Sequence, residues 1–237
     1  MKAIILVAGV GNRLRNITED PKCLLKINGV TLLERYLSTL DKVNVRDIIL
    51  VVGYKEERIR KTVEKAKFPG STKFIQNPYF TEGSILSLYS AKNELNGDIL
   101  LMDGDVYFDI KILQCLLNTN KGNLVAIDTT STSSGEEMMV GVKDNRILDM
   151  RRTLSGEFEL TGEAVGFYKL NKQACQELKK TMEEHVKSGK HELGYEDILP
   201  SLFEKVPFFP VIVDGMNWVE IDFEEDIVKA ENLTPSE

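Results

Sequence analysis

The first half of the chain alternates short apolar runs with helix-like segments, and this alternation most constrains its fold. Lys2 to Val7, Asp47 to Val52 and Asp98 to Met102 read as strands. Each is almost wholly apolar, as expected for a strand buried on both faces of a parallel sheet. Thr31 to Leu40 and Glu56 to Ala66 read as helices between them. Repeated strand–helix–strand units predict an α/β fold whose Rossmann-like, mostly parallel sheet is flanked by helices.

The rhythm changes after Asp128. Glu137 to Lys143 and Arg146 to Met150 flank Asp144-Asn145, which predicts a β-hairpin. Later strands and helices follow without a repeat or a linker. We therefore expect one domain over residues 1–237, with a core over 1–128 and an α+β part over 129–237 laid on the edge of the first sheet.

Composition narrows the class of protein. The 237 residues carry a net charge of −7, which argues against non-specific binding to nucleic acid. The three cysteines, Cys23, Cys115 and Cys175, lie far apart and have no metal-binding spacing, as in proteins of a reducing compartment. No apolar run approaches the length of a membrane span, and no secretory signal is visible. We expect a cytoplasmic enzyme without a membrane partner.

The first strand runs directly into a turn that suits a phosphate chain. Ala8, Gly9 and Gly11 are small residues whose backbone N–H groups can approach phosphate oxygens closely. Arg13 adds a planar fork of donors, and Lys22 adds a point charge beside a proline. The segment therefore offers a backbone cradle and two cations, which is what a nucleoside triphosphate requires.

Two common phosphate motifs do not fit this turn. No Gly-Lys-Ser/Thr follows it, as a P-loop would require, and Leu14 stands where a dinucleotide fingerprint has its third small residue. The composite Gly9-x-Gly11-x-Arg13-Leu14, followed by Pro21-Lys22, instead resembles the signature of the sugar-phosphate nucleotidyltransferase superfamily. The resemblance implies a nucleotide-diphospho-sugar transferase fold. It also implies that residues 1–128 bind the nucleotide and that residues 129–237 bind the acceptor.

Two acidic clusters follow predicted strands. Asp103-Gly104-Asp105 comes after one strand and Glu220-Ile221-Asp222 after another, at the sheet edge where α/β proteins bind ligands. Such residues often cap helices: Asp105 or Asp109 could cap a helix that begins at Ile110, and Asp222 could cap one that begins at Glu224. Taken alone, the position of Asp222 favours this capping role. The resemblance assigns Asp105 and Asp222 as ligands of Mg²⁺, a metal that prefers carboxylate oxygens. The resemblance thus places one metal ligand, Asp222, near the C-terminus, within the acceptor-binding part over residues 129–237.

The resemblance supplies the remaining candidate residues. Asn77 to Leu88 resembles the loop and helix start that hold the base, where Gly83 permits close contact and Ser84 can cap the helix. The members most similar are small cytidylyltransferases acting on phosphocholine, 2-aminoethylphosphonate or inositol 1-phosphate. Lys22 and Arg13 are the expected catalytic residues. The expected nucleotide contacts are Ala8, Gly9, Gly11, Arg13, Gly83, Ser84 and Asp103, and the expected acceptor contacts are Glu163, Tyr195 and Glu196.

The predicted reaction is Mg²⁺-dependent transfer of CMP from CTP to a small phosphate or phosphonate acceptor. The alternatives are a sugar-1-phosphate nucleotidyltransferase using UTP or dTTP, a nucleotide-binding regulatory module without activity, and a dehydrogenase. A dehydrogenase would need an acid about 20 residues beyond the glycine turn, at the end of a second strand, where Gly53 stands. A homodimer is compatible with the sequence.

Overall fold

The computed structural model describes residues 1–131 and 135–233. Its strands are β1 (Lys2–Leu6), β2 (Lys26–Ile27), β3 (Val30–Thr31), β4 (Asp47–Val52), β5 (Ser71–Gln76), β6 (Ile99–Asp103), β7 (Val106–Phe108), β8 (Asn123–Asp128), β9 (Met139–Lys143), β10 (Arg146–Arg151), β11 (Leu160–Leu170), β12 (Phe208–Ile212) and β13 (Trp218–Glu220). Its α-helices are α1 (Leu32–Lys42), α2 (Glu56–Ala66), α3 (Ser84–Ser90), α4 (Ile110–Asn118), α5 (Lys172–Lys187), α6 (Leu199–Phe203) and α7 (Glu224–Asn232).

The predicted α/β architecture is confirmed. β6, β1, β4 and β5 lie side by side and parallel, with helices in the connections between them. β11 then pairs antiparallel with β6, and strands β8 to β12 complete a mostly parallel mixed sheet. The second part of the chain thus continues the sheet through β11 rather than only covering its edge.

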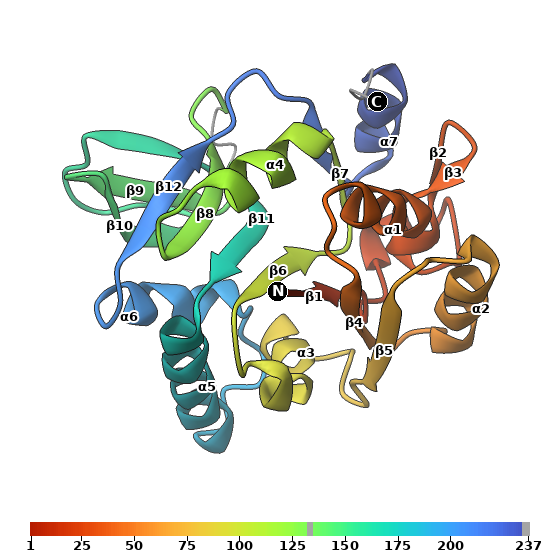
Figure 1. Ribbon diagram of the computed structural model, residues 1–237, viewed down its shortest axis with the longest axis horizontal. Helices are drawn as coiled ribbons and strands as arrows, with labels where there is room; N and C mark the ends of the chain where they lie inside the picture. The colour runs from red at the N-terminus through yellow and green to blue at the C-terminus, as the bar shows by residue number, and fades with distance from the viewer. Residues whose placement is uncertain (132–134, 234–237) are drawn as a thin grey trace.

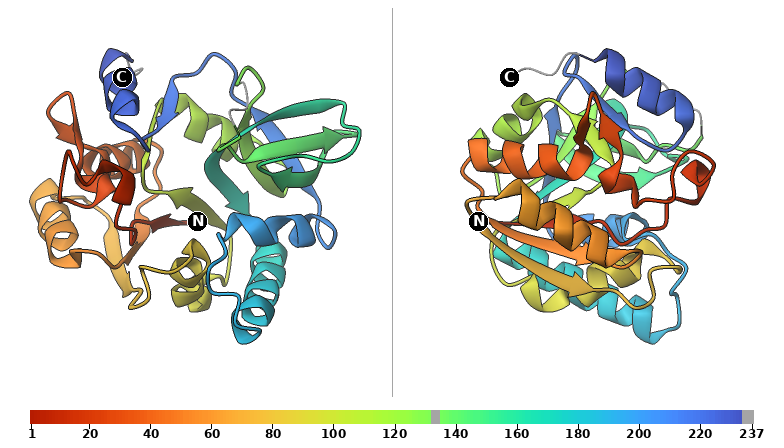
Figure 2. Two further views of the ribbon diagram at one scale, coloured as in Figure 1. Left: turned by 180° about the vertical axis from the view of Figure 1, so that it is seen from behind. Right: turned by 90° about the vertical axis from the view of Figure 1, so that its right-hand side faces the viewer.

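Each buried strand sends alternate side chains into two separate cores. Ile4, Ile49 and Leu101 pack on one face against α3, α5 and α6. Ile5 and Leu50 pack on the other face against α1, α2 and α4. Figure 1 shows the first set of helices below the sheet and α1 and α4 above it, and the rear view in Figure 2 agrees. The near-continuous apolar runs in these strands therefore follow from burial on both faces.

Local chemistry accounts for most element ends. Thr31 begins α1 with a reciprocal capping box to Glu34, and Asp109 begins α4 by accepting from the Lys111 N–H at 2.9 Å. Asp144 and Asn145 both have positive φ, which gives the tight turn of the β9–β10 hairpin that the sequence predicts. The helix predicted from Ser84 to Leu95 is shorter, because α3 ends at Ser90 and a separate 3₁₀ turn follows.

A short two-stranded ribbon outside the main sheet was not expected from the sequence. β7 pairs antiparallel with β13, with Glu220 opposite Val106. α7 follows directly and packs on a third small core around Leu14, Tyr107 and Ile221. This ribbon carries the C-terminal acidic cluster back to the end of β6.

Candidate active site

The β7–β13 ribbon gathers three carboxylates from two distant parts of the chain. Asp105 immediately precedes β7, while Glu220 ends β13 and Asp222 follows it. The Ile221 N–H donates to the backbone oxygen of Asp105 at 3.0 Å, which fixes the two segments together. One carboxylate oxygen of each acidic residue lies within 4.8 Å of the others. The structure therefore brings together the two predicted ligands and adds a third acid.

Lys22 lies between two of these carboxylates. Its Nζ donates to Asp105 Oδ2 at 3.1 Å and also contacts Asp222 Oδ1. Burial lowers the pKa of Lys22, but the adjacent Asp105 and Asp222 outweigh burial and raise that pKa above its ordinary value. The ammonium is therefore held charged at the centre of the site.

Gly11 makes room for the Lys22 side chain. A Cβ on Gly11 would lie 2.8 Å from Lys22 Cγ, and Gly11 adopts a left-handed φ of 67°. Any other residue would be strained there and would also displace the lysine stem. Gly11 is therefore needed to hold Lys22 in place, in addition to any contact that Gly11 makes with phosphate.

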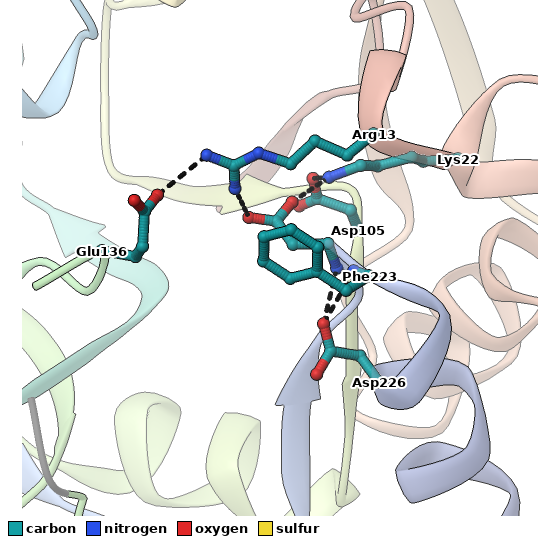
Figure 3. Close-up of polar contacts among 7 residues, drawn as sticks. Arg13, Lys22, Asp105, Glu136, Phe223 and Asp226 are labelled. Carbon is teal, nitrogen blue, oxygen red and sulfur yellow. Dashed lines mark hydrogen bonds and ion pairs between the residues drawn. The ribbon is translucent and has the colours of Figure 1, made fainter. Parts of the chain in front are cut away.

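Arg13 lies on the outer side of the same cluster. Its guanidinium donates to Asp222 Oδ2 at 2.9 Å and to Glu136 Oε2 at 2.8 Å, and its Cζ lies 4.9 Å from the centre of the Phe223 ring. Figure 3 shows Arg13 reaching between Glu136 and the acids beside Lys22. The hydrogen bond from Arg13 to Glu136 raises the pKa of Arg13, and the charges of Asp222 and Glu136 add to this rise, whereas burial opposes it. The two predicted cations therefore share Asp222.

Asp226 fixes the backbone that carries Asp222. Its Oδ2 accepts from the N–H groups of Asp222 and Phe223, at 3.1 and 2.8 Å, and its Oδ1 pairs with Lys229 at 2.8 Å. Asp226, the third residue of α7, thus bonds back to the N–H of the N-cap residue Phe223 and to the N–H before it, as an acid at this position of a capping box does. The Asp222 side chain itself pairs with Lys22 and Arg13. Figure 3 shows Asp226 contacting the backbone next to Phe223.

The carboxylate cluster has the chemistry of a hard-cation site. Asp105, Glu220 and Asp222 offer only oxygen donors, and no His or Cys joins this cluster within the described residues. Reduced hydration and the charges of Asp105 and Asp222 raise the pKa of Glu220, which is the expected response of an acid beside like charges. The residues therefore fit Mg²⁺, which prefers carboxylate oxygens and commonly takes one or two from protein.

An acidic cavity of about 530 Å³ opens beside the cluster. Its wall is made from the end of β8, β11, β13, the start of α7 and the segment before β9. Eight carboxylates line it and Lys229 is its one basic residue among those described; the acids are Asp128, Glu136, Glu137, Glu163, Glu220, Asp222, Glu225 and Asp226. Such a density of negative charge favours a cationic group over a neutral or anionic one.

One aromatic residue faces this cavity with a fixed orientation. The Trp218 indole N–H donates to Asp128 Oδ2 at 2.8 Å, and both residues line the cavity. Glu163 lines it as well and accepts a hydrogen bond from the Ser131 hydroxyl. Burial raises the pKa of Glu163, whereas the hydrogen bond from Ser131 opposes that rise. Of the three predicted acceptor contacts, Glu163 is the one that the structure places in this cavity.

Tyr195 and Glu196, the other two predicted acceptor contacts, belong to a buried network behind the cluster. The Tyr195 hydroxyl donates to Asp103 Oδ2 at 2.7 Å, and the Tyr168 hydroxyl donates to Glu196 Oε1 at 2.9 Å. The two tyrosine rings meet edge to face at 6.0 Å. Burial and the neighbouring acids raise the pKa of Asp103. Contacts of these residues with substrate stay a prediction.

The predicted base-binding segment packs against the chain before Tyr195. The Gly83 N–H donates to His191 O at 2.9 Å, and a Cβ on Gly83 would lie 2.1 Å from Leu193 O. Gly83 is the N-cap of α3 without a side-chain cap, so the prediction that Ser84 caps this helix is wrong. The Ser84 hydroxyl instead accepts from the Tyr195 N–H at 3.0 Å.

The glycine turn leaves part of its backbone open. Gly9 is exposed and lines a small cavity of about 130 Å³ together with Gly11, Lys22 and Asp105. Ala8 is buried, and its carbonyl accepts from the Tyr54 N–H at 3.0 Å. Gly9 and Gly11 therefore form the part of the turn that faces this cavity, directly beside Lys22, and their contact with phosphate stays a prediction.

Glu136 and Glu220 were not assigned a role from the sequence. Glu220 belongs to an acidic cluster that the sequence does show, but no pattern indicates that its side chain joins Asp105. Glu136 lies in the segment just before β9, and its contact with Arg13 depends on tertiary packing alone.

Within residues 1–131 and 135–233, no helix is both long enough and apolar enough to cross a bilayer.

The chain is similar to several nucleotidyltransferases. It is 29% identical over 241 residues to the bifunctional protein GlmU of Methanococcus vannielii, covering 98% of this chain and 54% of that protein. It is 38% identical over 108 residues to the choline-phosphate cytidylyltransferase of Streptococcus pneumoniae, covering 45% of each. The structure of the inositol-1-phosphate CTP transferase from T. maritima has the same fold, with a TM-score of 0.79, 18% identity and coverage of 98% and 96%.

The chain spans about half the length of the curated relatives that it matches along its whole length. The family model of MobA-like NTP transferase domains matches residues 3–182, from the first strand through most of α5. This match includes the glycine turn, Lys22 and Asp105. It covers well over half of the chain, and the chain therefore belongs to the MobA-like NTP transferase domains of the nucleotidyltransferase superfamily.

Proposed function

We propose that this chain transfers CMP from CTP to a small phosphate or phosphonate acceptor that also carries a cationic amine. Phosphocholine and 2-aminoethylphosphonate are acceptors of this kind. The observation that carries the proposal is the acidic cavity with Trp218 at its wall, beside the carboxylate cluster. Aromatic faces and carboxylates both attract ammonium groups, and six of the eight acids lie outside the carboxylate cluster that would hold Mg²⁺. A neutral sugar would gain little from these six acids.

The choice of CTP is supported by two of the similar proteins. The pneumococcal relative is a choline-phosphate cytidylyltransferase, and the T. maritima protein is a CTP transferase. The alternative of a sugar-phosphate substrate is kept because GlmU proteins are also similar over nearly the whole chain. A regulatory module without activity is disfavoured, because Arg13, Lys22, Asp105 and Asp222 meet in one site.

In the proposed reaction, an acceptor oxygen attacks the α-phosphorus of CTP. A new P–O bond forms, the bond from the α-phosphorus to the bridging oxygen breaks, and pyrophosphate leaves with its electron pair. The acceptor oxygen is already ionised near neutral pH, so no general base is required. The protein contributes alignment and neutralisation of charge. Lys22 would stabilise the α-phosphate, while Arg13 would exchange its acidic partners for the departing phosphates.

Asp105 and Asp222, with Glu220 beside them, would hold Mg²⁺. The ion would supply charge neutralisation for the reacting phosphates. Lys22 and Arg13 already balance two of the three negative charges in this cluster, so they keep the carboxylates close together. The acidic cavity would then receive the amine end of the acceptor, which leaves its phosphate end near Lys22.

Substrate assays test this proposal directly. We expect pyrophosphate release with CTP and either phosphocholine or 2-aminoethylphosphonate, and much less with inositol 1-phosphate or glucose 1-phosphate, because those acceptors lack an amine. The four nucleoside triphosphates should be assayed with each acceptor. Turnover only with UTP or dTTP and the sugar phosphate would assign the chain to the sugar-1-phosphate class. No turnover with any pair would contradict the proposal.

Glu163→Gln should raise the KM for a cationic acceptor about fivefold to tenfold with a smaller effect on kcat. The change removes one charge near the ammonium, and a charge pair near a protein surface is worth about 1 kcal/mol or somewhat more. Steady-state kinetics with phosphocholine at saturating CTP measure it. Glu157→Gln, at an exposed position, is the matched control and should change neither constant. If Glu163→Gln and Glu157→Gln had the same KM for phosphocholine, Glu163 would not contribute to acceptor binding.

A further inference from the structure

A second charged cavity lies away from the transfer site and is basic. It has a volume of about 360 Å³ and lies between α2 and the segment that leads into β2. Lys26, Arg58, Lys61 and Lys65 line it, and Asp20 is its single acidic residue among those described. Figure 1 shows α2 and the β2–β3 hairpin next to each other at the edge of the molecule. Four cations on a chain of net charge −7 are a marked local excess.

Three of these cations share one face of α2. Arg58, Lys61 and Lys65 follow one another at steps of three and four residues, which places them along a single stripe of the helix. The stripe extends over two turns, or about 10 Å at 1.5 Å per residue. A chain of linked phosphates matches this length better than a single phosphate does.

Most of the positive charge in this cavity has no acidic partner. Among the described residues, neither Lys26, Lys61 nor Lys65 forms an ion pair within 4.0 Å. Arg58 forms an ion pair with Asp20. An anion that enters the cavity would have to compete with this carboxylate for Arg58. Glu34 lies near enough for Lys26 and Lys65 to lower its pKa, but its hydrogen bonds with Thr31 have the larger effect.

We propose that this cavity binds a polyphosphorylated small anion, separately from the nucleotide that reacts. The cations suit phosphate oxygens, since Arg offers a bidentate fork and Lys a mobile point charge. Polar and aliphatic neighbours, Thr31, Thr62 and Leu24, complete the wall. Bound anion and Asp20 compete for Arg58, and Asp20 is two residues before Lys22. The ligand would therefore act on the segment that carries Lys22.

Calorimetric titration of sodium tripolyphosphate into the whole protein tests the site. The titration is made without CTP and acceptor, at a constant free Mg²⁺ concentration, so that no triphosphate competes for the basic cavity. Binding at this cavity is the part of the signal that is lost in the Lys61→Gln/Lys65→Gln variant, because tripolyphosphate bound at the transfer site is common to both proteins. We expect binding of one tripolyphosphate at this cavity, tighter than that of orthophosphate. The Lys61→Gln/Lys65→Gln variant should bind at least about tenfold more weakly, because two charge-assisted contacts are lost.

Two further variants show whether tripolyphosphate binds specifically in this cavity or only to positive charge anywhere on the surface. Lys187→Gln/Lys190→Gln removes the same charge from the end of α5 and should leave the affinity unchanged. Asp20→Asn removes the internal competitor of the anion and should tighten binding. Equal affinity in the Lys61→Gln/Lys65→Gln variant and the wild type, an equal loss in the α5 control, or weaker binding after Asp20→Asn would overturn the proposal. CMP transfer by the Lys61→Gln/Lys65→Gln variant should stay at the wild-type rate, which keeps this test distinct from that of the proposed reaction.

Discussion

Asp105→Asn is expected to reduce turnover by about 10³-fold or more while leaving the fold intact. A metal ion in such a site supplies several kcal/mol of charge stabilisation, and each 1.36 kcal/mol corresponds to a tenfold change in rate. The amide keeps the shape of the side chain but loses the charge that would hold Mg²⁺. The backbone hydrogen bond from Ile221 to the Asp105 carbonyl does not depend on the side chain. Pyrophosphate release over a range of Mg²⁺ concentrations measures the loss.

Asp98→Asn is a matched control for this change. Asp98 is exposed just before β6, at the opposite end of the strand that leads to Asp105. Both variants lose one carboxylate, so both share any general effect of the net charge. The control should keep wild-type turnover, and both proteins should melt within a few degrees of the wild type. Wild-type activity of Asp105→Asn at millimolar Mg²⁺ would refute the metal assignment.

The main sheet could be predicted because its strands carry their own evidence. Asp47 to Val52 and Glu56 to Ala66 have the bounds that the sequence indicated, since a strand buried on two faces is continuously apolar and a surface helix is charged. The β9–β10 hairpin was likewise marked by Asp144-Asn145, two residues that tolerate positive φ. Local chemistry decides such elements, so a single sequence is enough.

The site could be predicted only in part, because its assembly depends on long-range pairing. β7 and β13 have three residues each, too few to show an alternating pattern, and their pairing brings Glu220 to Asp105. The contact of Arg13 with Glu136 likewise joins segments without any local signal. The glycine turn and the acidic clusters were visible as residue types. Their distances from one another are a property of the tertiary fold.

Gly83 has a structural reason that the sequence did not indicate. The sequence suggested that a glycine there allows a nucleotide base to approach closely. The structure places the carbonyl of Leu193 where its Cβ would be, so packing within the protein already requires glycine. A short motif cannot separate these two causes, because both demand the absence of a side chain. The segment before Tyr195, in the second part of the chain, therefore supports the start of α3 directly.

Lys22→Ala should lower kcat by about 10² to 10³-fold and weaken CTP binding much less. The Lys22 ammonium is a preorganised donor, and loss of one such donor to the transition state typically costs this much. Its preorganisation is evident from Asp105 and Asp222, which raise its pKa and hold it charged despite burial. Steady-state rates at saturating CTP and acceptor, together with the Kd for CTP, separate rate from affinity.

Lys22→Met is the control that distinguishes loss of the charge from loss of side-chain packing. Methionine keeps an unbranched stem against Gly11, where the lysine stem now lies, and lacks only the charge. Both variants remove a cation that neutralises Asp105 and Asp222, so neither should weaken Mg²⁺ binding. A rate loss with undiminished Mg²⁺ affinity therefore identifies a direct effect of the ammonium on the reacting phosphates. If the affinity for CTP collapses while turnover at saturation survives, Lys22 binds the nucleotide and does not stabilise the transition state.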